Sequence, residues 1–212
     1  MRPSHSQRHE PAPGWPEFWD LYYAGKWEPD TYELLRDLLR PDDLLVDVGA
    51  WIGPVSLWAL ELDANVIAIE PDPVARMPLH RNLSAWPRAR WEIWPCAITP
   101  ASGVDAWLSP STAGTFGTSE SSVVAPASNT IAVQARSLPD IIGDRDARVA
   151  VIDIEGYEAQ LMPTLGPWLV EHGAACRVSL HGRSRPVDAA AWFPGARNIH
   201  ETIDRDALVM LP

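Results

Sequence analysis

The chain has 212 residues, and its 17 Lys or Arg against 28 Asp or Glu give a formal net charge of −11. A chain of this length is expected to fold as one domain with a sizeable core. The acidic balance argues against a nucleic-acid partner, because a phosphate backbone requires a basic face, and it permits a small neutral or cationic substrate.

Residues 1–14 are polar and lack the apolar centre of a signal peptide, so we expect a disordered tail. We expect no metal binding by His5 or His9 in this tail. No apolar run approaches the ~20 residues that cross a membrane. Cys96 and Cys176 stand alone, as buried thiols of a reduced compartment do. The sequence therefore predicts a cytoplasmic protein without a membrane partner.

Two helices are predicted over residues 15–40, as a cap on an α/β core that fills residues 41–212 of the same domain. The first helix has an aromatic face, which consists, at helical spacing, of Trp15, Phe18, Trp19, Tyr22 and Tyr23. This face either packs in the core or in a homodimer contact, or it forms a lid over a cofactor cleft. The second helix begins at Asp30-x-x-Glu33, an aspartate variant of the capping box, and ends before Pro41.

A strand, a glycine turn and a helix follow one another around Asp47-Val48-Gly49-Ala50-Trp51-Ile52-Gly53. The apolar run at 43–48 predicts a buried strand, and Pro54 suits the first position of a helix. Glycines in such a turn let the backbone approach a ligand, and the helix N-terminus presents free N–H groups. Glu70 ends the next apolar run, and a carboxylate about 20 residues past the turn can bind ribose hydroxyls. The unit predicts a site for a nucleoside-bearing cofactor.

The turn favours S-adenosylmethionine over a dinucleotide. Dinucleotide folds use G-x-G-x-x-G, whereas this chain has D-x-G-x-x-x-G. Asp47 takes the place of the first glycine and would repel a pyrophosphate, but it suits an ammonium or a sulfonium. S-adenosylmethionine carries both groups, together with a ribose for Glu70. The alternative is an ordinary strand, turn and helix with a chance acid.

Strand and helix signals alternate along the chain. Strands are predicted at 43–48, 65–70, 90–94, 104–108, 130–135, 148–153 and 176–181, and helices at 54–62, 73–84, 137–142, 156–171 and 187–193. Such alternation predicts an α/β, Rossmann-like fold with a mainly parallel seven-stranded sheet and helices on both faces. Residues 207–211 are expected to add a short antiparallel edge strand. Pro163 and Pro167 are expected to kink or split the long helix.

A second group of polar residues follows the apolar strand at 148–153, in the run D-I-E-G-Y-E at 153–158. Ligands of open α/β sheets bind beyond the carboxyl ends of the strands, so Asp153 should join the two acids named above. His181 would lie at the same edge. The alternatives are a helix cap for Asp153 and a backbone-bonded core histidine for His181, while Glu158 is expected to face solvent or to pair locally.

The Ser-, Thr-, Gly- and Ala-rich segment 109–129 cannot form core by itself, and long loops of this kind are usually functional or disordered. We interpret it as a loop that faces the substrate.

The order of these motifs resembles that of the FkbM-type methyltransferases over roughly residues 25–182. The matching motifs are Trp27-Glu28-Pro29, D-V-G-A-x-I-G at 47–53, Glu70-Pro71-Asp72-Pro73, Asn82-Leu83, Cys96-Ala97-Ile98, G-T-S-E-S-S at 117–122, Ser137-Leu138 and D-I-E-G-Y-E at 153–158. The resemblance implies a class I methyltransferase fold, S-adenosylmethionine as cofactor, and O-methylation of sugars or natural-product hydroxyls.

The resemblance also implies which residues contact the cofactor. They are Glu28, Asp47, Gly49, Ala50, Trp51, Gly53, Glu70, Pro71 and Ala97. Trp51 departs from the family pattern, which usually has a small polar residue there, so its ring either narrows the pocket or turns outward. The lysine that often precedes D-I-E-G is Val151 here, and any role of that lysine is absent.

Methyl transfer from a sulfonium to a hydroxyl requires aligned reactants and an acceptor activated by a base or a metal. Asp153 is the predicted base and His181 its orienting partner. Alternatively, both could hold a divalent cation with Glu155; the sequence leaves this open, and no metal is predicted. The sequence thus predicts an O-methyltransferase acting on a sugar, a glycan or a small natural product. The alternatives are a non-catalytic domain that keeps the fold and binds a partner, and a nicotinamide-dependent oxidoreductase.

Overall fold

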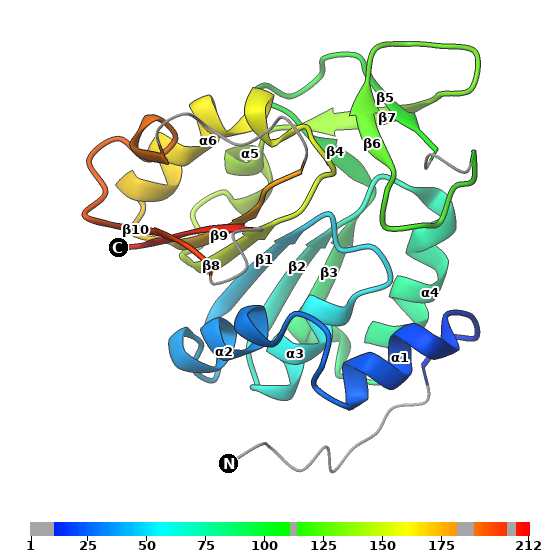
Figure 1. Cartoon of the computed structure of the whole chain (residues 1–212), viewed down its shortest axis with the longest axis horizontal. Coiled ribbons are helices and arrows are strands. Elements are labelled where there is room, and N and C mark those ends of the chain that lie inside the picture. The colour runs from blue at the N-terminus through cyan, green and yellow to red at the C-terminus, as the bar shows by residue number, and fades with distance from the viewer. Residues whose placement is uncertain (1–10, 111–113, 182–188, 203–206) are drawn as a thin grey trace.

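The computed structural model describes residues 11–110, 114–181, 189–202 and 207–212, and its main sheet has seven strands (Figure 1). Their order is β10 (Asn198–Glu201), β11 (Ala207–Leu211), β9 (Ala175–Ser179), β8 (Ala147–Ile152), β1 (Leu44–Val48), β2 (Asn65–Ile69) and β3 (Trp91–Trp94). The five strands from β9 to β3 are parallel, whereas β11 and β10 are added by antiparallel pairing. The prediction of a mainly parallel seven-stranded sheet is confirmed.

Helices cover both faces of this sheet, as predicted (Figure 1). One face carries α1 (Pro16–Tyr23), α2 (Pro29–Leu38), α3 (Pro54–Glu61) and α4 (Pro73–Leu83), and the other carries α5 (Leu138–Ile142), α6 (Glu158–Glu171) and the 3-10 turn Ala189–Ala191. Because successive strand residues point to opposite faces, Leu45 packs in the first core and Val46 in the second. The parallel strands are therefore apolar on both sides.

The aromatic face of α1 packs in the core on the α3 side of the sheet. Trp19 and Tyr22 are buried, and the Tyr22 ring stacks on Trp58 of α3 with 5.2 Å between ring centroids. Ala12, which falls within the predicted tail of residues 1–14, is buried, and its N–H donates to Asn82 Oδ1 of α4. Residues 1–10 of the predicted tail lie outside the described residues. The homodimer contact stays a prediction.

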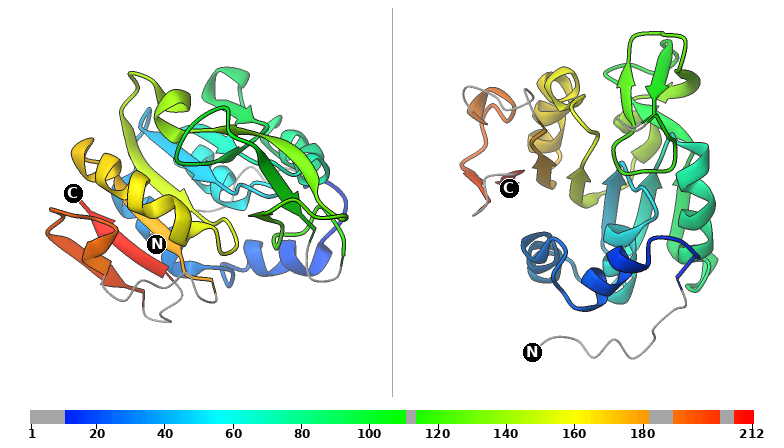
Figure 2. Two further views of the ribbon diagram at one scale, coloured as in Figure 1. Left: turned by 90° about the horizontal axis from the view of Figure 1, so that it is seen from above. Right: turned by 45° about the vertical axis from the view of Figure 1, so that its right-hand side comes forward.

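Two predicted strands belong to a second sheet, which corrects the sequence prediction. This four-stranded sheet has the order β4 (Cys96–Ile98), β7 (Ile131–Arg136), β5 (Ala106–Ser109) and β6 (Ser122–Val124). It stands over one end of the main sheet and does not continue it (Figure 2). Apolar runs predict strands but not their partners, so β5 and β7 could not be assigned to a sheet from sequence. The segment interpreted as a loop contains β6.

Three local predictions are also corrected. The capping box at Asp30 does not form, because Pro29 begins α2 one residue earlier and its N-cap is Glu28, whose side chain makes no capping hydrogen bond. Helix α6 is continuous through Pro163 and Pro167, so the predicted split is wrong, and the predicted kink stays a prediction. The antiparallel strand at 207–211 is present, but β10 lies outside it as the edge.

Two further features complete the fold. The short 3-10 turn Arg88–Arg90 precedes β3. The helix predicted at 187–193 is 3-10 at 189–191, and its first two residues lie outside the described part of the chain. No helix in the described ranges is both long and apolar enough to span a bilayer.

Candidate functional site

A cleft opens at the carboxyl ends of β1, β2 and β8, beneath the second sheet and the loop at 114–121. Nine of the eleven residues proposed from sequence line this cleft. They are Glu28, Asp47, Gly49, Ala50, Trp51, Glu70, Pro71, Ala97 and Asp153. Gly53 and His181 are not among its lining residues. His181 nevertheless contacts Asp153, whereas Gly53 lies on the side of the turn that faces α4.

Glycine is required at Gly49 by the neighbouring strand. Its φ is +85°, and a Cβ atom there would lie 1.8 Å from the Asp153 carbonyl oxygen. The N–H groups of Gly49 and Ala50 donate to Ile69 O, while Asp153 N–H donates to Val48 O. The turn is thus held between β2 and β8. A side chain at this position would meet the Asp153 backbone, which directly follows β8.

Gly53 acts on the start of helix α3. Its φ is +93°, and a Cβ atom would lie 2.7 Å from Leu79 Cδ1 of α4. It is the N-cap of α3, and Pro54 takes the first helical position. In the described fold Gly53 therefore has a packing role. Its proposed contact with the cofactor stays a prediction.

Asp47 is buried at the end of β1 and bonded to the start of α3. Its Oδ2 accepts a hydrogen bond of 2.6 Å from Ser56 Oγ, and the Ser56 backbone N–H also donates to it. Burial, helped by the charges of Asp153 and Glu28, raises the pKa of Asp47 to about 7 against the lowering effect of these bonds. A cation in the cleft would favour the charged form of this carboxylate.

Glu70 shapes the same turn from the end of β2. Its Oε2 accepts from Trp51 N–H at 2.8 Å and its Oε1 accepts from Asp72 N–H at 2.7 Å. Burial raises the pKa of Glu70 to about 7, while the two backbone bonds lower it. Each carboxylate oxygen keeps a second lone pair. Glu70 can therefore fix the turn and still accept hydrogen bonds from a ligand.

Asp72, which sequence reasoning did not single out, ties α4 to the serine-rich loop. Its Oδ1 accepts from Val74 N–H as an N-cap, and its Oδ2 accepts from Gly117 N–H at 2.5 Å and Ser121 Oγ at 3.2 Å. These bonds hold the loop over the cleft, which Thr118, Ser119 and Ser121 line. The signal available in the sequence was the N-cap position of Asp72 directly before Pro73.

Trp51 joins the N-terminal cap to that loop. It has φ 48°, its indole Nε1–H donates to Gly117 O at 3.0 Å, and its ring meets Phe18 edge to face at a centroid distance of 4.8 Å. Trp15 makes a similar edge contact at 5.7 Å. Trp51 therefore lines the cleft and closes it on one side, which decides between the two orientations left open by the sequence.

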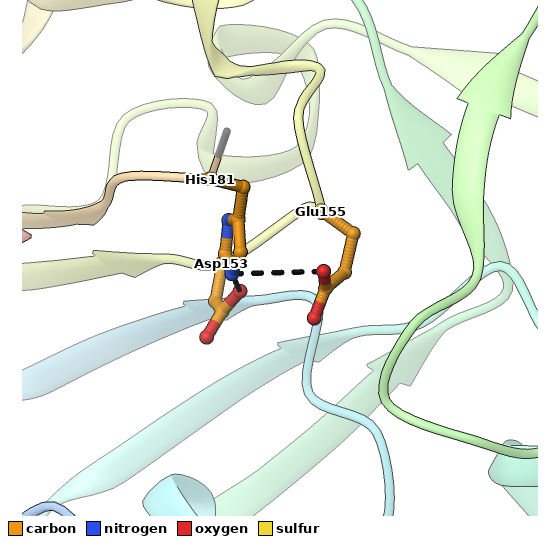
Figure 3. Close-up of side chains that lie close together, drawn as sticks. All are labelled: Asp153, Glu155 and His181. Atoms are coloured by element: carbon orange, nitrogen blue, oxygen red, sulfur yellow. Dashed lines mark ion pairs between the residues drawn. The ribbon is translucent and has the colours of Figure 1, made fainter. Parts of the chain in front are cut away.

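Three side chains, Asp153 and Glu155 from the segment after β8 and His181 from the segment after β9, meet beside the end of the cleft that Asp153 lines (Figure 3). His181 Nε2 lies 3.4 Å from Asp153 Oδ1 and 3.6 Å from Glu155 Oε2. The turn brings Glu155 toward the imidazole through positive φ values at Glu155 (53°) and Gly156 (101°). The sequence prediction that Asp153 and His181 come together is thus confirmed by their geometry.

The charges in this group act on one another. The hydrogen bond with Glu158 raises the pKa of His181 to about 9, against the effect of burial. Burial raises the pKa of Glu155 to about 7, while the charge of His181 lowers it. Burial also raises the pKa of Asp153, and the charges of His181 and Arg177 act in the opposite direction.

Glu158 was expected to face solvent or to pair locally, and the structure confirms the second alternative. Its side chain is 0% exposed. Its Oε1 is 3.0 Å from His181 Nδ1, and its two oxygens accept from Ile154 N–H and Gly156 N–H. The local pairing was correct, but the bond to His181 depends on the adjacency of β8 and β9.

Arg177 was also missed. This β9 side chain is 2% exposed, donates from Nη1 to Ser179 Oγ, and places Nη2 3.4 Å from Glu28 Oε2. Glu28 additionally accepts from Thr31 Oγ1 at 2.7 Å, and burial raises its pKa while Arg177 lowers it. An arginine inside the apolar run of β9 was the available signal, since unpaired charges are rarely buried.

No protein-family model and no curated protein sequence matches this chain. Similar solved structures include the methyltransferase FkbM from Methylobacillus flagellatus KT, at 19% identity and TM-score 0.56, covering 85% of this chain and 50% of that one. An rRNA methylase from Streptococcus thermophilus has 12% identity and TM-score 0.51, with 86% and 94% covered. A methyltransferase from Geobacter sulfurreducens has 14% identity and TM-score 0.50, with 94% and 89% covered.

These likenesses show a shared fold: the chain has the Rossmann-like fold of methyltransferases. The chain spans about half the length of the Methylobacillus flagellatus protein.

Proposed function

We propose that this protein is an S-adenosylmethionine-dependent methyltransferase that O-methylates a hydroxyl of a sugar, a glycan or a small natural product. The observation that carries the proposal is the convergence of Asp47, Glu70 and Asp153 on one cleft around the Gly49 turn. The methyltransferase fold of the similar solved structures and the order of the sequence motifs support it.

The cofactor would occupy the end of the cleft formed by β1 and β2. Asp47 offers a buried carboxylate to the ammonium group, and Glu70 offers acceptor lone pairs to the ribose hydroxyls. The loop held by Asp72 would cover the bound cofactor, because Thr118 and Ser121 line the same cleft. Exclusion of water by such a cover strengthens the electrostatic contacts inside.

The acceptor would approach from the β8 end, where Asp153 lines the cleft. The acceptor oxygen forms a bond to the methyl carbon, the carbon–sulfur bond breaks, and its electron pair stays on sulfur as a thioether. The hydroxyl proton leaves in this step and would pass to the Asp153 carboxylate, which would act as the general base. His181, 3.4 Å from Asp153, would orient it.

A nucleic-acid acceptor is disfavoured for this chain, although one of the similar structures is described as an rRNA methylase. The net charge is −11, and the acceptor end of the cleft carries Asp153 and Glu155. A phosphate backbone would be repelled there, because nucleic-acid binding depends on cationic contacts.

The test uses two measurements on the purified chain. Calorimetric titration with S-adenosylhomocysteine should show one site, and NADH should show none. Labelled S-adenosylmethionine, offered with a panel of sugar and natural-product alcohols, should then transfer its methyl group to a hydroxyl of at least one acceptor. Cofactor binding without turnover on any hydroxyl would favour a non-catalytic domain, and binding of NADH would favour an oxidoreductase.

A further inference from the structure

In the described part of the chain, Asp153, Glu155 and His181 form a cluster of possible metal ligands. Their ligand atoms all lie within 4.8 Å of one another. The two distances from His181 Nε2 are 3.4 Å and 3.6 Å. Ligand atoms bound at about 2.0–2.2 Å around a tetrahedral ion lie about 3.4 Å apart. Two of the three separations therefore match those around one shared ion, and the third, between the two carboxylates, is within 4.8 Å (Figure 3).

The imidazole is held in the orientation that a metal ligand requires. Its Nδ1 bonds to Glu158 Oε1 at 3.0 Å, so its Nε2 points at the two other carboxylates. Glu158 is fixed in turn by the N–H groups of Ile154 and Gly156, which belong to the turn that carries Glu155. A carboxylate behind a histidine is the usual support of a histidine metal ligand, because it fixes the ring and its tautomer.

In the part of the chain that the structure describes, one acceptor atom of the cluster has an ion-pair contact but no hydrogen bond: Asp153 Oδ1 lies 3.4 Å from His181 Nε2. Asp153 Oδ1 is buried and accepts no hydrogen bond from any described residue. Leaving a buried carboxylate oxygen without a partner is costly. Arg177 does not neutralise the group alone, because its guanidinium is also paired with Glu28. The carboxylates of Asp153 and Glu155 thus place negative charge next to His181 Nε2.

We propose that Asp153, Glu155 and His181 bind one divalent transition-metal ion, with Mn²⁺ or Zn²⁺ as the expected class, at the acceptor end of the cleft. Two carboxylates and one imidazole suit these ions better than an all-oxygen site would. Three protein ligands leave a coordination position for an acceptor hydroxyl, whose pKa a bound metal lowers. The role assigned to this ion rests on the proposed function: the hydroxyl bound to the metal would lose its proton to solvent, and Asp153 would act as a metal ligand in place of the activating role given above.

The direct test is metal binding, measured without turnover. Isothermal titration with MnCl₂ and with ZnCl₂ is carried out on a background of His5→Ala and His9→Ala, which removes the histidines of the N-terminal tail. One site per chain is expected. His181→Ala and Glu155→Gln should each weaken binding by more than about 10-fold, and Glu158→Gln by about 10- to 100-fold through misorientation of the ring. His200→Ala, a histidine on β10, is the matched control and should bind as the background protein does.

Each variant is also titrated with S-adenosylhomocysteine, which separates the two proposals. Unchanged cofactor affinity together with lost metal affinity supports the metal site. Equal metal affinity in the background protein, His181→Ala and Glu155→Gln would overturn it, as would full methyl transfer in EDTA with no loss of rate. The proposed function would survive both of those results, and it fails separately if S-adenosylhomocysteine does not bind to any of these proteins.

Discussion

The two ends of the cleft hold their carboxylates in different ways. At the β1–β2 end, Asp47 bonds to Ser56 and Glu70 accepts two backbone N–H groups, so each acid is fixed by the turn or the helix next to it. At the β8–β9 end, Asp153 and Glu155 face His181, and Asp153 Oδ1 has no hydrogen-bond partner among the described residues. The first arrangement fixes the carboxylates through hydrogen bonds to neighbouring residues. The second leaves carboxylate oxygens that can bind an acceptor or a cation. We therefore expect variants at the first end to act on binding and folding, and variants at the second end to act on turnover.

The largest effect on stability is expected where the Gly49 turn of the β1–β2 end contacts Asp153 of the β8–β9 end. Gly49→Ala places a Cβ atom 1.8 Å from the Asp153 carbonyl, which the backbone of β8 cannot avoid without moving. We expect a loss of unfolding free energy above ~4 kcal/mol, or no folded protein. Gly103→Ala is the control, because φ is also positive there but no atom lies within 4 Å, so only ~1–3 kcal/mol of backbone strain is expected. Denaturant titration measures both, and similar losses for the two variants would refute the clash.

The second prediction concerns the role of Asp153, at the acceptor end of the cleft, in turnover. Asp153→Asn keeps the size of the side chain but removes its charge, so turnover should fall by ~10²–10⁴-fold. Affinity for S-adenosylhomocysteine should stay nearly constant, since the cofactor contacts lie at the other end. Asp146→Asn, an exposed acid at the opposite end of β8, is the control and should leave the rate unchanged. A near-normal rate in Asp153→Asn with a true acceptor would remove this residue from the mechanism.

The third prediction concerns Glu70 at the cofactor end. Glu70→Gln removes a charged acceptor, and hydrogen bonds to charged groups contribute ~1.5–3 kcal/mol. Cofactor affinity should fall by roughly one to two decades. S-methylmethionine, which has the sulfonium and the ammonium but no ribose, should lose much less. Equal losses for the two ligands in calorimetry would show that Glu70 acts only through the N–H groups of Trp51 and Asp72.

A smaller effect is expected from the contact between Trp51 and the loop. Trp51→Phe removes the bond from Nε1 to Gly117 O but keeps an aromatic ring beside Phe18. A neutral hydrogen bond contributes ~0.5–1.5 kcal/mol, so cofactor affinity should weaken by about 2- to 10-fold. Trp91→Phe removes a comparable indole–carbonyl bond to Trp86 away from the cleft, and it should not change this affinity. If both variants bind alike, the loop does not cover the cofactor.

The last prediction is a pH dependence of stability. Because burial raises the pKa of Asp47 from 3.8 to about 7, the folded state binds more protons than the unfolded state between those values. The contribution of Asp47 to stability is therefore fully present below pH ~4 and is lost as the pH rises toward 7. Unfolding free energies measured from pH 5 to pH 8 should fall less steeply in Asp47→Asn. Bound S-adenosylhomocysteine should also flatten the wild-type curve, because its ammonium favours the charged carboxylate; identical slopes in all three cases would contradict this account.

Much of the fold was predictable because its signals are local. Apolar runs, Pro54 at a helix start and the glycines of the turn placed β1, α3 and the cofactor end of the cleft, since each of these depends on neighbours in the chain. The same logic found Asp153, which directly follows a buried strand. It could not assign β5 and β7 to a sheet, because strand partners are set by contacts that no local pattern encodes.

The sequence by itself determined the α/β alternation, the turn from Asp47 to Gly53 and the acids that end β2 and β8. Only the tertiary structure decided what these residues touch. Gly49 is required by the carbonyl of Asp153, and Trp51 is oriented by Gly117 and Phe18. Glu158 pairs with His181, which follows the adjacent strand β9. The physical reason is that parallel strands bring together residues far apart in the chain, and burial and charge pairing follow from that adjacency.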